Sequence, residues 1–419
     1  MFEHLQIADR RERLAVGIAD LALAAAAPLV RLASHGRRES ARPSILLLRL
    51  ERIGDLVMAL DAVRAVRLLA PEATIDLVVG SWNEGLARLV GGIDRVETLD
   101  ARWLARGAGG VGWRQLVGRA RQWRRRRYDL AINFEGDVRS HALLAVSGAP
   151  TRVGFEMAGG GPLLTVRVPH DPKRHVADNA LRLVAAAFGL DEAALCEKAA
   201  QAGVLRQGLT PPADARAHAA RLLAASGVRV GTDAGPLVGL HASGGREVKQ
   251  WDLGRLAEVG RRLVEVRGAQ LVLTGSEGDR PVVDRLRTSL GAGLPVVDLS
   301  GSHDVVVMAA VLERLALFVT PDTGPMHLAD AVGTPLVAIH GPSDPARWGP
   351  RSSGARVVRV DLWCSPCNRI RRPPDRCVGH LPDCLAAVTV DAVLAAAVEQ
   401  IDSGRRRTRE GSDGVRDAD

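Results

Sequence analysis

Aromatic residues are scarce in this 419-residue chain, where Phe, Trp and Tyr together make up 3% of the composition. The cores are therefore expected to consist of Leu, Val and Ala, within a hydrophobic content of 47%. No G-x-G-x-x-G sequence follows the first strand of either expected domain and no Walker A sequence occurs, which argues against a dehydrogenase and a P-loop kinase. A carboxylate cluster that would suggest bound magnesium is also absent from the sequence.

The length of the chain limits the number of domains, and its net charge indicates the kind of partner. At roughly 100–200 residues per domain, the chain is long enough for two large domains. Most of its 56 basic residues are Arg, and the formal net charge is +8, which favours an anionic partner. The densest basic run, RQWRRRRYD at 121–129, interleaves Trp123 and Tyr128. Without a recognition module, this run indicates a solvated helix face rather than a nucleic-acid site.

The N-terminal segment imitates a signal peptide or membrane span over residues 10–33. Asp20, Pro28 and Arg31 interrupt it, which disfavours both a true span and a cleaved signal. The pattern predicts a helical extension within residues 1–43 that either packs on the body of the protein or lies on a membrane surface. In the second case anionic headgroups would meet Arg10, Arg11, Arg13, Arg37 and Arg38. Residues 35–43 are expected to form a linker.

From residue 44 onward, short apolar runs alternate with segments of helical periodicity, which is typical of doubly wound parallel α/β sheets. The pattern predicts a Rossmann-like domain over 44–205 and a second one over 206–402. The charged tail, 403–419, is expected to be disordered. In such sheets ligands bind beyond the carboxyl ends of the strands, so the loops there should carry the chemistry.

The clearest loop is PDTGPMHLADAVG at 321–333, which follows an apolar strand. Pro325 suits the first helical position, and Thr323 and Gly324 would present unpaired backbone N–H groups to a pyrophosphate. Asp322 would be repelled by phosphate and is better suited to accept hydrogen bonds from sugar hydroxyls. The alternative is that Asp322 only caps the helix.

Three stretches of the chain resemble the signature regions of glycosyltransferase family 9, the bacterial lipopolysaccharide heptosyltransferases. They are ILLLRLERIGDLVMALDAVRAVRLLAPEATIDLVV, LHASGGREVKQWDLGRLAEV and FVTPDTGPMHLADAVGTPLVAIHGPSDPARWGP, within residues 44–400. The resemblance implies an α/β protein of GT-B architecture, with two Rossmann-like domains facing across a cleft. It also implies an ADP-heptose donor and an inverting transfer without a catalytic metal.

Asp55 matches the catalytic Asp proposed for this family. An inverting transfer needs one general base to take the proton from the acceptor hydroxyl as that hydroxyl attacks the anomeric carbon. Asp55 directly follows Gly54 at the expected carboxyl end of the first strand. The alternative role is a cap for the helix that starts at Leu56.

The donor diphosphate is expected to meet Lys249, which matches the phosphate-contacting Lys of the family, together with Thr323 and Gly324. Weaker donor candidates are Ser243, Glu277 and His327.

The acceptor side departs from the family, whose usual Asp-x-Gln-Gly reads Asn133, Phe134, Glu135, Gly136 here. The candidates for an anionic or lipid-linked glycan acceptor are Arg139, Ser140 and Arg152. Solvation at the surface is the alternative for these three.

Four of the five cysteines lie in one window as C-x2-C-x9-C-x6-C. Disulfides would be reduced in a cytoplasmic enzyme, so four thiolates predict a structural zinc or iron site rather than a catalytic cofactor. The ligands would be Cys364, Cys367, Cys377 and Cys384. Uncoordinated or disulfide-bonded thiols are the alternative.

These features predict transfer of a sugar, expected to be heptose, to a saccharide or lipid-linked saccharide of the cell envelope. The enzyme would act in the cytoplasm, with peripheral contact to the inner membrane if the N-terminal helix binds lipid. One alternative is a sugar-nucleotide-binding scaffold without turnover. Others are an epimerase or phosphorylase of the same fold, or a transferase acting on a protein or small molecule.

Overall fold

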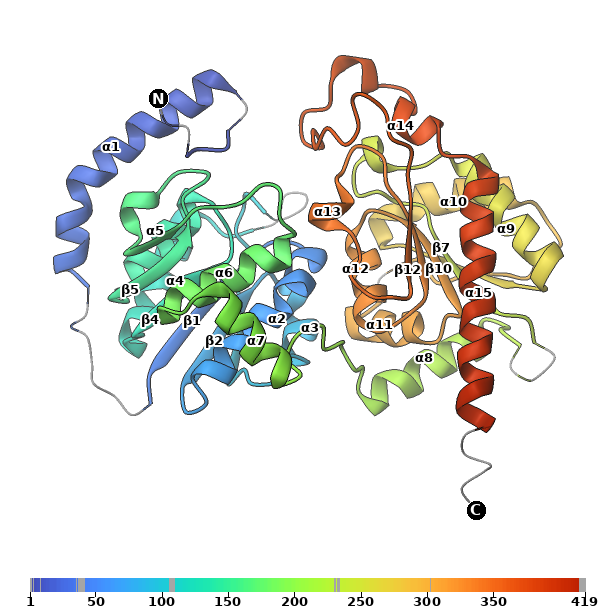
Figure 1. Ribbon diagram of the computed structural model, residues 1–419, viewed down its shortest axis with the longest axis horizontal. Helices are drawn as coiled ribbons and strands as arrows, with labels where there is room; N and C mark the ends of the chain where they lie inside the picture. Colours follow the sequence, from blue (N-terminus) through green and yellow to red (C-terminus); the bar gives the residue numbers. More distant parts are fainter. Residues whose placement is uncertain are drawn as a thin grey trace. The chain divides into compact units, whose positions relative to one another are not determined.

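The computed structural model describes residues 2, 4–7, 9–34, 36, 42–104, 110–229, 231, 234–301 and 303–413. It divides into two compact units, Met1–Gln207 and Gly208–Asp419 (Figure 1). The division lies just beyond residue 205, where the composition placed the end of the first domain. The expected linker falls largely outside the described residues, as do Arg37 and Arg38.

Unit 1 contains a six-stranded parallel sheet in the order β3-β2-β1-β4-β5-β6. Its strands are β1 (Ser44–Arg49), β2 (Thr74–Val79), β3 (Arg95–Thr98), β4 (Leu130–Asn133), β5 (Thr151–Phe155) and β6 (Val166–Val168). Its helices are α1 (Arg10–Leu32), α2 (Ile53–Leu69), α3 (Glu84–Arg88), α4 (Trp113–Arg126), α5 (Val138–Ser147), α6 (Val176–Phe188) and α7 (Glu192–Gln201), with 3-10 turns η1 (Ser81–Asn83) and η2 (Gly161–Leu163).

Unit 2 repeats this plan with a parallel sheet in the order β12-β11-β10-β7-β8-β9. Its strands are β7 (Leu237–His241), β8 (Gln270–Thr274), β9 (Val296–Asp298), β10 (Leu317–Pro321), β11 (Leu336–Ile339) and β12 (Ala355–Val358). Its helices are α8 (Ala213–Ala225), α9 (Leu253–Arg267), α10 (Arg280–Leu290), α11 (Val305–Glu313), α12 (Gly324–Ala331), α13 (Pro345–Trp348), α14 (Asp383–Ala386) and α15 (Val390–Asp413), with 3-10 turns η3 (Glu247–Lys249), η4 (Glu277–Asp279) and η5 (Asp375–Cys377).

Both units therefore have the strand order of a Rossmann sheet, with the order reversing beside the first strand of each unit. In unit 1 the reversal lies between β1 and β4, and Leu48 pairs with Asn133 there. In unit 2 it lies between β7 and β10, and Val319 pairs with Leu240. Loops that follow these paired strands emerge at the same edge of each sheet, which is where ligands bind in this fold.

The cores follow from continuous apolar strands. Leu46, Leu47 and Leu48 of β1 are completely buried, as expected for a parallel strand covered on both faces. α4 and α5 pack on the face that presents Leu46 and Leu48. In unit 2, residues of α9, α10 and α15 pack together on one cluster with β7 and β8.

The basic run at the end of α4 is tied into unit 1. Trp123 and Tyr128 are each 1% exposed, so neither ring can stack on a nucleobase. Tyr128 donates its hydroxyl proton to Asp76, and Arg126 forms an ion pair with the same carboxylate at 2.8 Å. The aromatic residues in this run are core residues.

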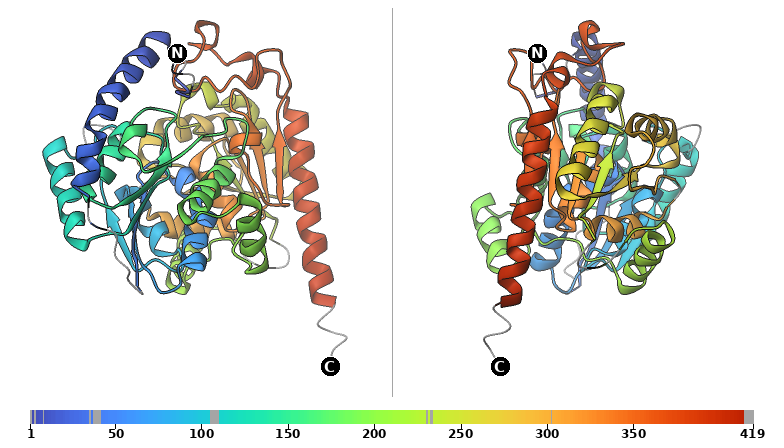
Figure 2. Two further views of the ribbon diagram at one scale, coloured as in Figure 1. Left: turned by 60° about the vertical axis from the view of Figure 1, so that its left-hand side comes forward. Right: turned by 90° about the vertical axis from the view of Figure 1, so that its right-hand side faces the viewer.

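The expected disordered tail is helical over 403–413, because α15 continues to Asp413 (Figure 2). Val393, Ala397 and Ile401 bury one face of the helix in the core of unit 2 and fix its direction. Arg and Glu are good helix formers, so the helix propagates into the charged segment. Residues 414–419 lie outside the described residues.

Candidate functional site

The loop between β10 and α12 presents the start of a helix without a side-chain cap. α12 begins at Gly324, so Pro325 is its second residue rather than its first. The N-cap position is Thr323, whose side chain makes no capping hydrogen bond and instead lies 3.3 Å from the Thr320 hydroxyl. The interpretation of Asp322 as the helix cap is therefore wrong, and the first N–H groups of α12 are available to an anion.

Asp322 is joined to Lys249, which comes from the loop after β7. The Lys249 ammonium lies 3.1 Å from Asp322 Oδ2, and the side chains are 17% and 9% exposed. Burial favours the neutral acid. The positive charge of Lys249, followed by that of His340 and His327, outweighs burial and places the pKa of Asp322 below its ordinary value. The site therefore holds a carboxylate and an ammonium side by side.

His340 and Ser343, which the sequence reasoning missed, belong to the same region. They follow β11, the strand next to β10, and are 0% and 1% exposed. Among the described residues, His340 Nε2 is a buried atom without a hydrogen-bond partner, whereas the Ser343 hydroxyl faces the Asp322 carboxylate and helps to lower its pKa. Buried polar atoms are normally satisfied, so His340 Nε2 indicates a place where a ligand could bind. The signal was present in the polar residues of IHGPSD at the end of an apolar strand.

Ser243 and Glu277 lie at the ends of β7 and β8. Ser243 is 5% exposed, and its hydroxyl accepts a hydrogen bond from the Gly245 N–H. Burial raises the pKa of Asp279, but hydrogen bonds from Ser243 and Ser276 outweigh it and lower that pKa. Glu277 is 62% exposed and pairs with Arg280 at 3.0 Å. Ser243 is thus part of a polar cluster, whereas Glu277 belongs to a surface ion pair.

Asp55 of unit 1 is the third residue of α2 and follows the carboxyl end of β1. The helix begins at Ile53 rather than Leu56, with Arg52 at the N-cap, so Asp55 is not the N-cap residue. Its Oδ2 accepts a hydrogen bond from the Arg52 N–H at 3.1 Å and stabilises the helix start from the third position. Its other oxygen, Oδ1, lies 3.6 Å from the Arg49 guanidinium. The side chain is 31% exposed, which leaves the carboxylate open to an approaching hydroxyl. The capping and catalytic roles are compatible.

Arg49, another residue that sequence reasoning missed, orders the loop around Asp55. It is 3% exposed and donates to the backbone oxygens of Asp55 at 3.0 Å and Phe134 at 2.8 Å. It also pairs with Glu51 at 2.8 Å. Arg49 therefore links the loop after β1 to the loop after β4, at the reversal point of the sheet. Its place as the last residue of an apolar strand was the available signal.

Glu135 lies buried in the same region, within the Asn133–Gly136 stretch. It accepts hydrogen bonds from the Leu50 N–H and from the Ser140 hydroxyl, the latter at 2.8 Å. Burial raises its pKa to about 7, although the Arg49 charge and these hydrogen bonds oppose the rise. The protonation of Glu135 therefore changes near neutral pH.

Of the three acceptor candidates, Ser140 and Arg152 are buried inside unit 1 and form hydrogen bonds there. Ser140 is 0% exposed and bonded to Glu135. Arg152 is 1% exposed and donates to the oxygens of Leu163 at 2.7 Å and Ser34 at 2.8 Å. Neither side chain is at the surface, either for solvent or for a glycan. Arg139 is 41% exposed, pairs with Asp137 and lies over the Trp103 ring.

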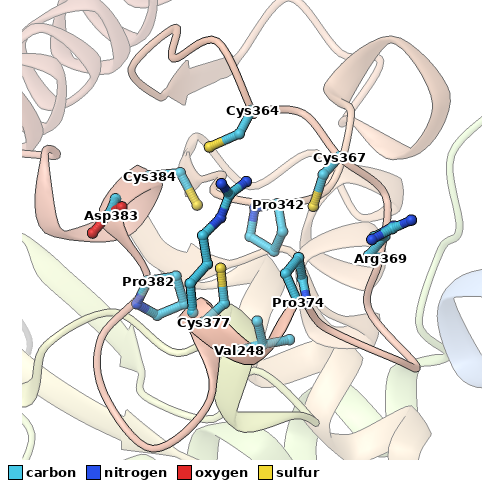
Figure 3. Close-up of a pocket in the computed structure, with 11 residues that line it drawn as sticks. Val248, Pro342, Cys364, Cys367, Arg369, Pro374, Cys377, Pro382, Asp383 and Cys384 are labelled. Atoms are coloured by element: carbon cyan, nitrogen blue, oxygen red, sulfur yellow. The ribbon is translucent and has the colours of Figure 1, made fainter.

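The four clustered cysteines line one pocket in unit 2 (Figure 3). None is disulfide-bonded, and their sulfurs point into a cavity of about 20 Å³, which has room for about one water molecule. Burial, and then the proximity of Cys367 and Cys377, raises the pKa of the Cys384 thiol to about 11. Arg369 and Arg376 also line the pocket.

This arrangement does not fit a preformed tetrathiolate centre. Within the described ranges, no three His, Cys, Asp or Glu side chains are grouped to hold a metal ion. A zinc or iron site at the cysteines therefore stays a prediction, and no chemical step depends on it. Metal analysis of the wild type beside Cys367→Ser would test it, with Cys196→Ser as the matched control.

The model of glycosyltransferase family 9 (heptosyltransferase) matches residues 118–376. Lipooligosaccharide heptosyltransferase 2 of Haemophilus influenzae is 25% identical over 322 residues, covering 76% of this chain and 88% of that protein. Lipopolysaccharide heptosyltransferase 2 of Escherichia coli K12 is 26% identical over 315 residues, covering 74% and 85%.

Two solved structures share the fold. ADP-heptose lps heptosyltransferase II of E. coli matches with a TM-score of 0.68 and 20% identity, covering 86% of this chain and 99% of that chain. A family 9 glycosyl transferase from Veillonella parvula matches with a TM-score of 0.70 and 22% identity, covering 88% and 100%. Both matches extend over the two Rossmann-like units, so the GT-B-like fold is confirmed.

Proposed function

We propose that this chain, which belongs to glycosyltransferase family 9, the heptosyltransferases, transfers heptose. The donor would be ADP-heptose, and the acceptor would be a saccharide of the lipopolysaccharide core. The relatives named above act on lipopolysaccharide or lipooligosaccharide by their names. The E. coli heptosyltransferase WaaC with ADP-2-deoxy-2-fluoro heptose shares the fold, with a TM-score of 0.57 and 19% identity. The match covers 84% of this chain and 97% of the WaaC chain.

The observation that carries this proposal is the Lys249–Asp322 pair beside the uncapped start of α12. The diphosphate of the donor would take hydrogen bonds from the first N–H groups of α12 and charge from Lys249. Asp322 stays ionised and accepts hydrogen bonds from sugar hydroxyls. His340 Nε2, buried and unpaired within the described residues, would gain a partner from the donor.

Asp55 is the proposed general base for the acceptor. As the acceptor oxygen forms its bond to the anomeric carbon, its proton passes to the carboxylate. The bond between the anomeric carbon and the diphosphate oxygen breaks on the opposite face, and ADP leaves with the bonding electrons. Arg49 holds the loop so that Asp55 keeps its orientation, and it acts as a positioning residue.

The reaction does not require a catalytic metal in this proposal, because Lys249 and the helix dipole supply the positive charge for the leaving group. A nucleotide-sugar donor implies a cytoplasmic reaction. A lipid-linked acceptor implies that the reaction takes place at the inner membrane.

The test combines donor binding with turnover. Calorimetry should show that ADP binds the wild type and that Lys249→Gln weakens binding by about 10–100-fold, since hydrogen bonds to charged groups contribute roughly 1.5–3 kcal/mol. With ADP-heptose and heptose-deficient lipopolysaccharide, the wild type should release ADP and extend the acceptor. A wild type that binds ADP but extends no heptose-deficient core would indicate a binding scaffold and contradict the proposal.

A further inference from the structure

The N-terminal helix α1 is fixed to unit 1 by one narrow face. Gly17, Asp20 and Ala27 are its buried residues. The Asp20 carboxylate accepts a hydrogen bond from the Gly160 N–H at 2.7 Å, in the turn before η2. Beyond the helix, Ser34 accepts a hydrogen bond from Arg152 at 2.8 Å. α1 is thus attached to unit 1 chiefly at η2 and the turn before it (Figures 1 and 2).

The remaining surface of α1 is apolar and exposed. Of the eleven large hydrophobic side chains that are exposed in the described part of the chain, five lie on this helix. They are Leu14 (48% exposed), Ile18 (57%), Leu21 (62%), Leu29 (70%) and Leu32 (82%). Their spacing is helical, and exposed alanines fill the positions between them. We refer to these five residues as the apolar stripe of α1.

Charge is confined to the two ends of this stripe. Between Leu14 and Val30 the one charged residue is Asp20, which is buried against Gly160. Exposed Arg10 and Arg11 precede the stripe and exposed Arg31 lies in its last turn. Asp9 and Glu12 are the acidic residues at the first end, and they cap and begin the helix.

The breadth of this face and the position of its charges favour a lipid bilayer as its partner. A soluble partner helix would cover one seam, whereas the exposed apolar surface here occupies most of the circumference. Self-association would also bring arginines together, since either a parallel or an antiparallel pairing places a basic end against a basic end. A bilayer with anionic headgroups covers a broad apolar face and neutralises arginines at both ends.

Length alone would allow this helix to cross a membrane, because its 23 residues have a mean hydropathy of 1.7 in the most apolar window. The buried Asp20 bond to Gly160, Pro28 within the helix and Arg31 near its end favour a helix that lies on the surface. We infer that α1 is a docking surface for an anionic phospholipid bilayer, with its apolar stripe inserted at the boundary between headgroups and acyl chains.

This docking would hold unit 1, which carries Asp55, at a membrane surface. The inference itself does not rest on the proposed reaction, because lipid binding needs neither donor nor acceptor. A failure of vesicle binding would not contradict the proposed transfer reaction, and a failure of turnover would not contradict the inferred membrane binding.

Vesicle flotation of the full-length protein tests the inference. Wild type should float with vesicles of phosphatidylcholine and phosphatidylglycerol, less with phosphatidylcholine alone, and less in high salt. The triple variant Ile18→Gln/Leu21→Gln/Leu29→Gln should bind at least about tenfold more weakly, because three inserted side chains become polar. All three positions are exposed, so the melting temperature should match that of the wild type.

The matched control is Leu190→Gln, since Leu190 is a 40% exposed apolar residue of unit 1 outside α1. It should float like the wild type. Equal flotation of the triple variant, or no flotation of the wild type, would overturn the inference. Light scattering gives the remaining outcome: dimers of the wild type that do not bind vesicles would assign the stripe to a second copy of the chain and likewise overturn it.

Discussion

The two units have the same strand order but carry different chemistry at the same topological position. In unit 1, the loops at the reversal point contain Asp55 and Glu135 around one buried Arg49. In unit 2, the corresponding loops contain a Lys249–Asp322 pair and an uncapped helix start. The common topology determines where a site lies, and in the proposed function the side chains of unit 1 accept a proton while those of unit 2 bind an anion.

The largest expected effect comes from Asp55→Asn. Asn can still accept the hydrogen bond from the Arg52 N–H, so the cap and the fold should be kept. Loss of the base should lower kcat by about 10²–10⁴-fold. ADP affinity should stay unchanged, because the proposed diphosphate site belongs to unit 2. Steady-state kinetics and calorimetry check this split, and a loss of ADP affinity without a loss of kcat would contradict the division of roles.

The next effect is expected from Lys249→Met. ADP affinity should fall about 10–100-fold, because a charge-assisted contact to the diphosphate is removed. The pKa of Asp322 should rise, since Lys249 is the main group that lowers it against burial. The variant should also be less stable, because it leaves a buried carboxylate without its ion-pair partner.

The double variant Lys249→Met/Asp322→Asn separates these two effects. Stability should recover, since no buried charge is left unpaired, while ADP affinity should stay low. Thermal unfolding and calorimetry on the same samples measure both quantities. Recovered ADP binding in the double variant would argue that Lys249 acts only to neutralise Asp322.

A smaller effect concerns the stability of unit 1 as a function of pH. The pKa of Glu135 is about 7 in the fold, against an ordinary value of 4.5. The folded state therefore binds this proton more tightly than the unfolded state, so the contribution to stability is present below about 4.5 and is lost as the pH rises to about 7.

Glu135→Gln should remove this pH dependence. The amide mimics the protonated acid, and the difference in the free energy of unfolding between pH 5 and pH 7 should shrink by about 1–3 kcal/mol relative to the wild type. Denaturant unfolding at a series of pH values measures it. Glu156→Gln, a half-buried Glu of the same unit, provides the control. Parallel pH profiles for the wild type and Glu135→Gln would show that Glu135 does not titrate in this range.

The smallest effect is expected from Glu277→Gln. This residue is a weaker donor candidate by sequence, but it forms a surface ion pair with Arg280 and is 62% exposed. ADP affinity should change by less than about twofold and stability by less than about 0.5 kcal/mol. A loss of ADP affinity comparable to that of Lys249→Gln would return Glu277 to the donor site.

Sequence reasoning went furthest where local pattern and structure coincide. The apolar runs that begin at Ser44 and Leu317 are buried strands, and the polar residues directly after them lie at sheet edges. Contacts between segments far apart in the sequence could not be predicted. Lys249 and Asp322 are 73 positions apart and were assigned separate tasks, although they form one ion pair.

The burial of polar side chains was the other property that the sequence pattern could not predict. Ser140 and Arg152 are polar and were expected at an acceptor surface, yet both are inside unit 1 because neighbouring loops provide hydrogen-bond partners for them. His340 was overlooked for the same reason: its importance comes from the packing of β11 beside β10, which brings it near Asp322.

The amino-acid sequence by itself determined the two α/β units, the helix start at Thr323 and Gly324, and the amphipathic character of residues 10–33, because these depend on hydrophobic period and local capping preferences. Tertiary structure alone decided that Lys249 pairs with Asp322, that Arg49 orders the loop of Asp55, and which face of α1 stays exposed. Such contacts depend on how parallel strands align distant loops at one edge of a sheet, and local sequence carries no record of that alignment.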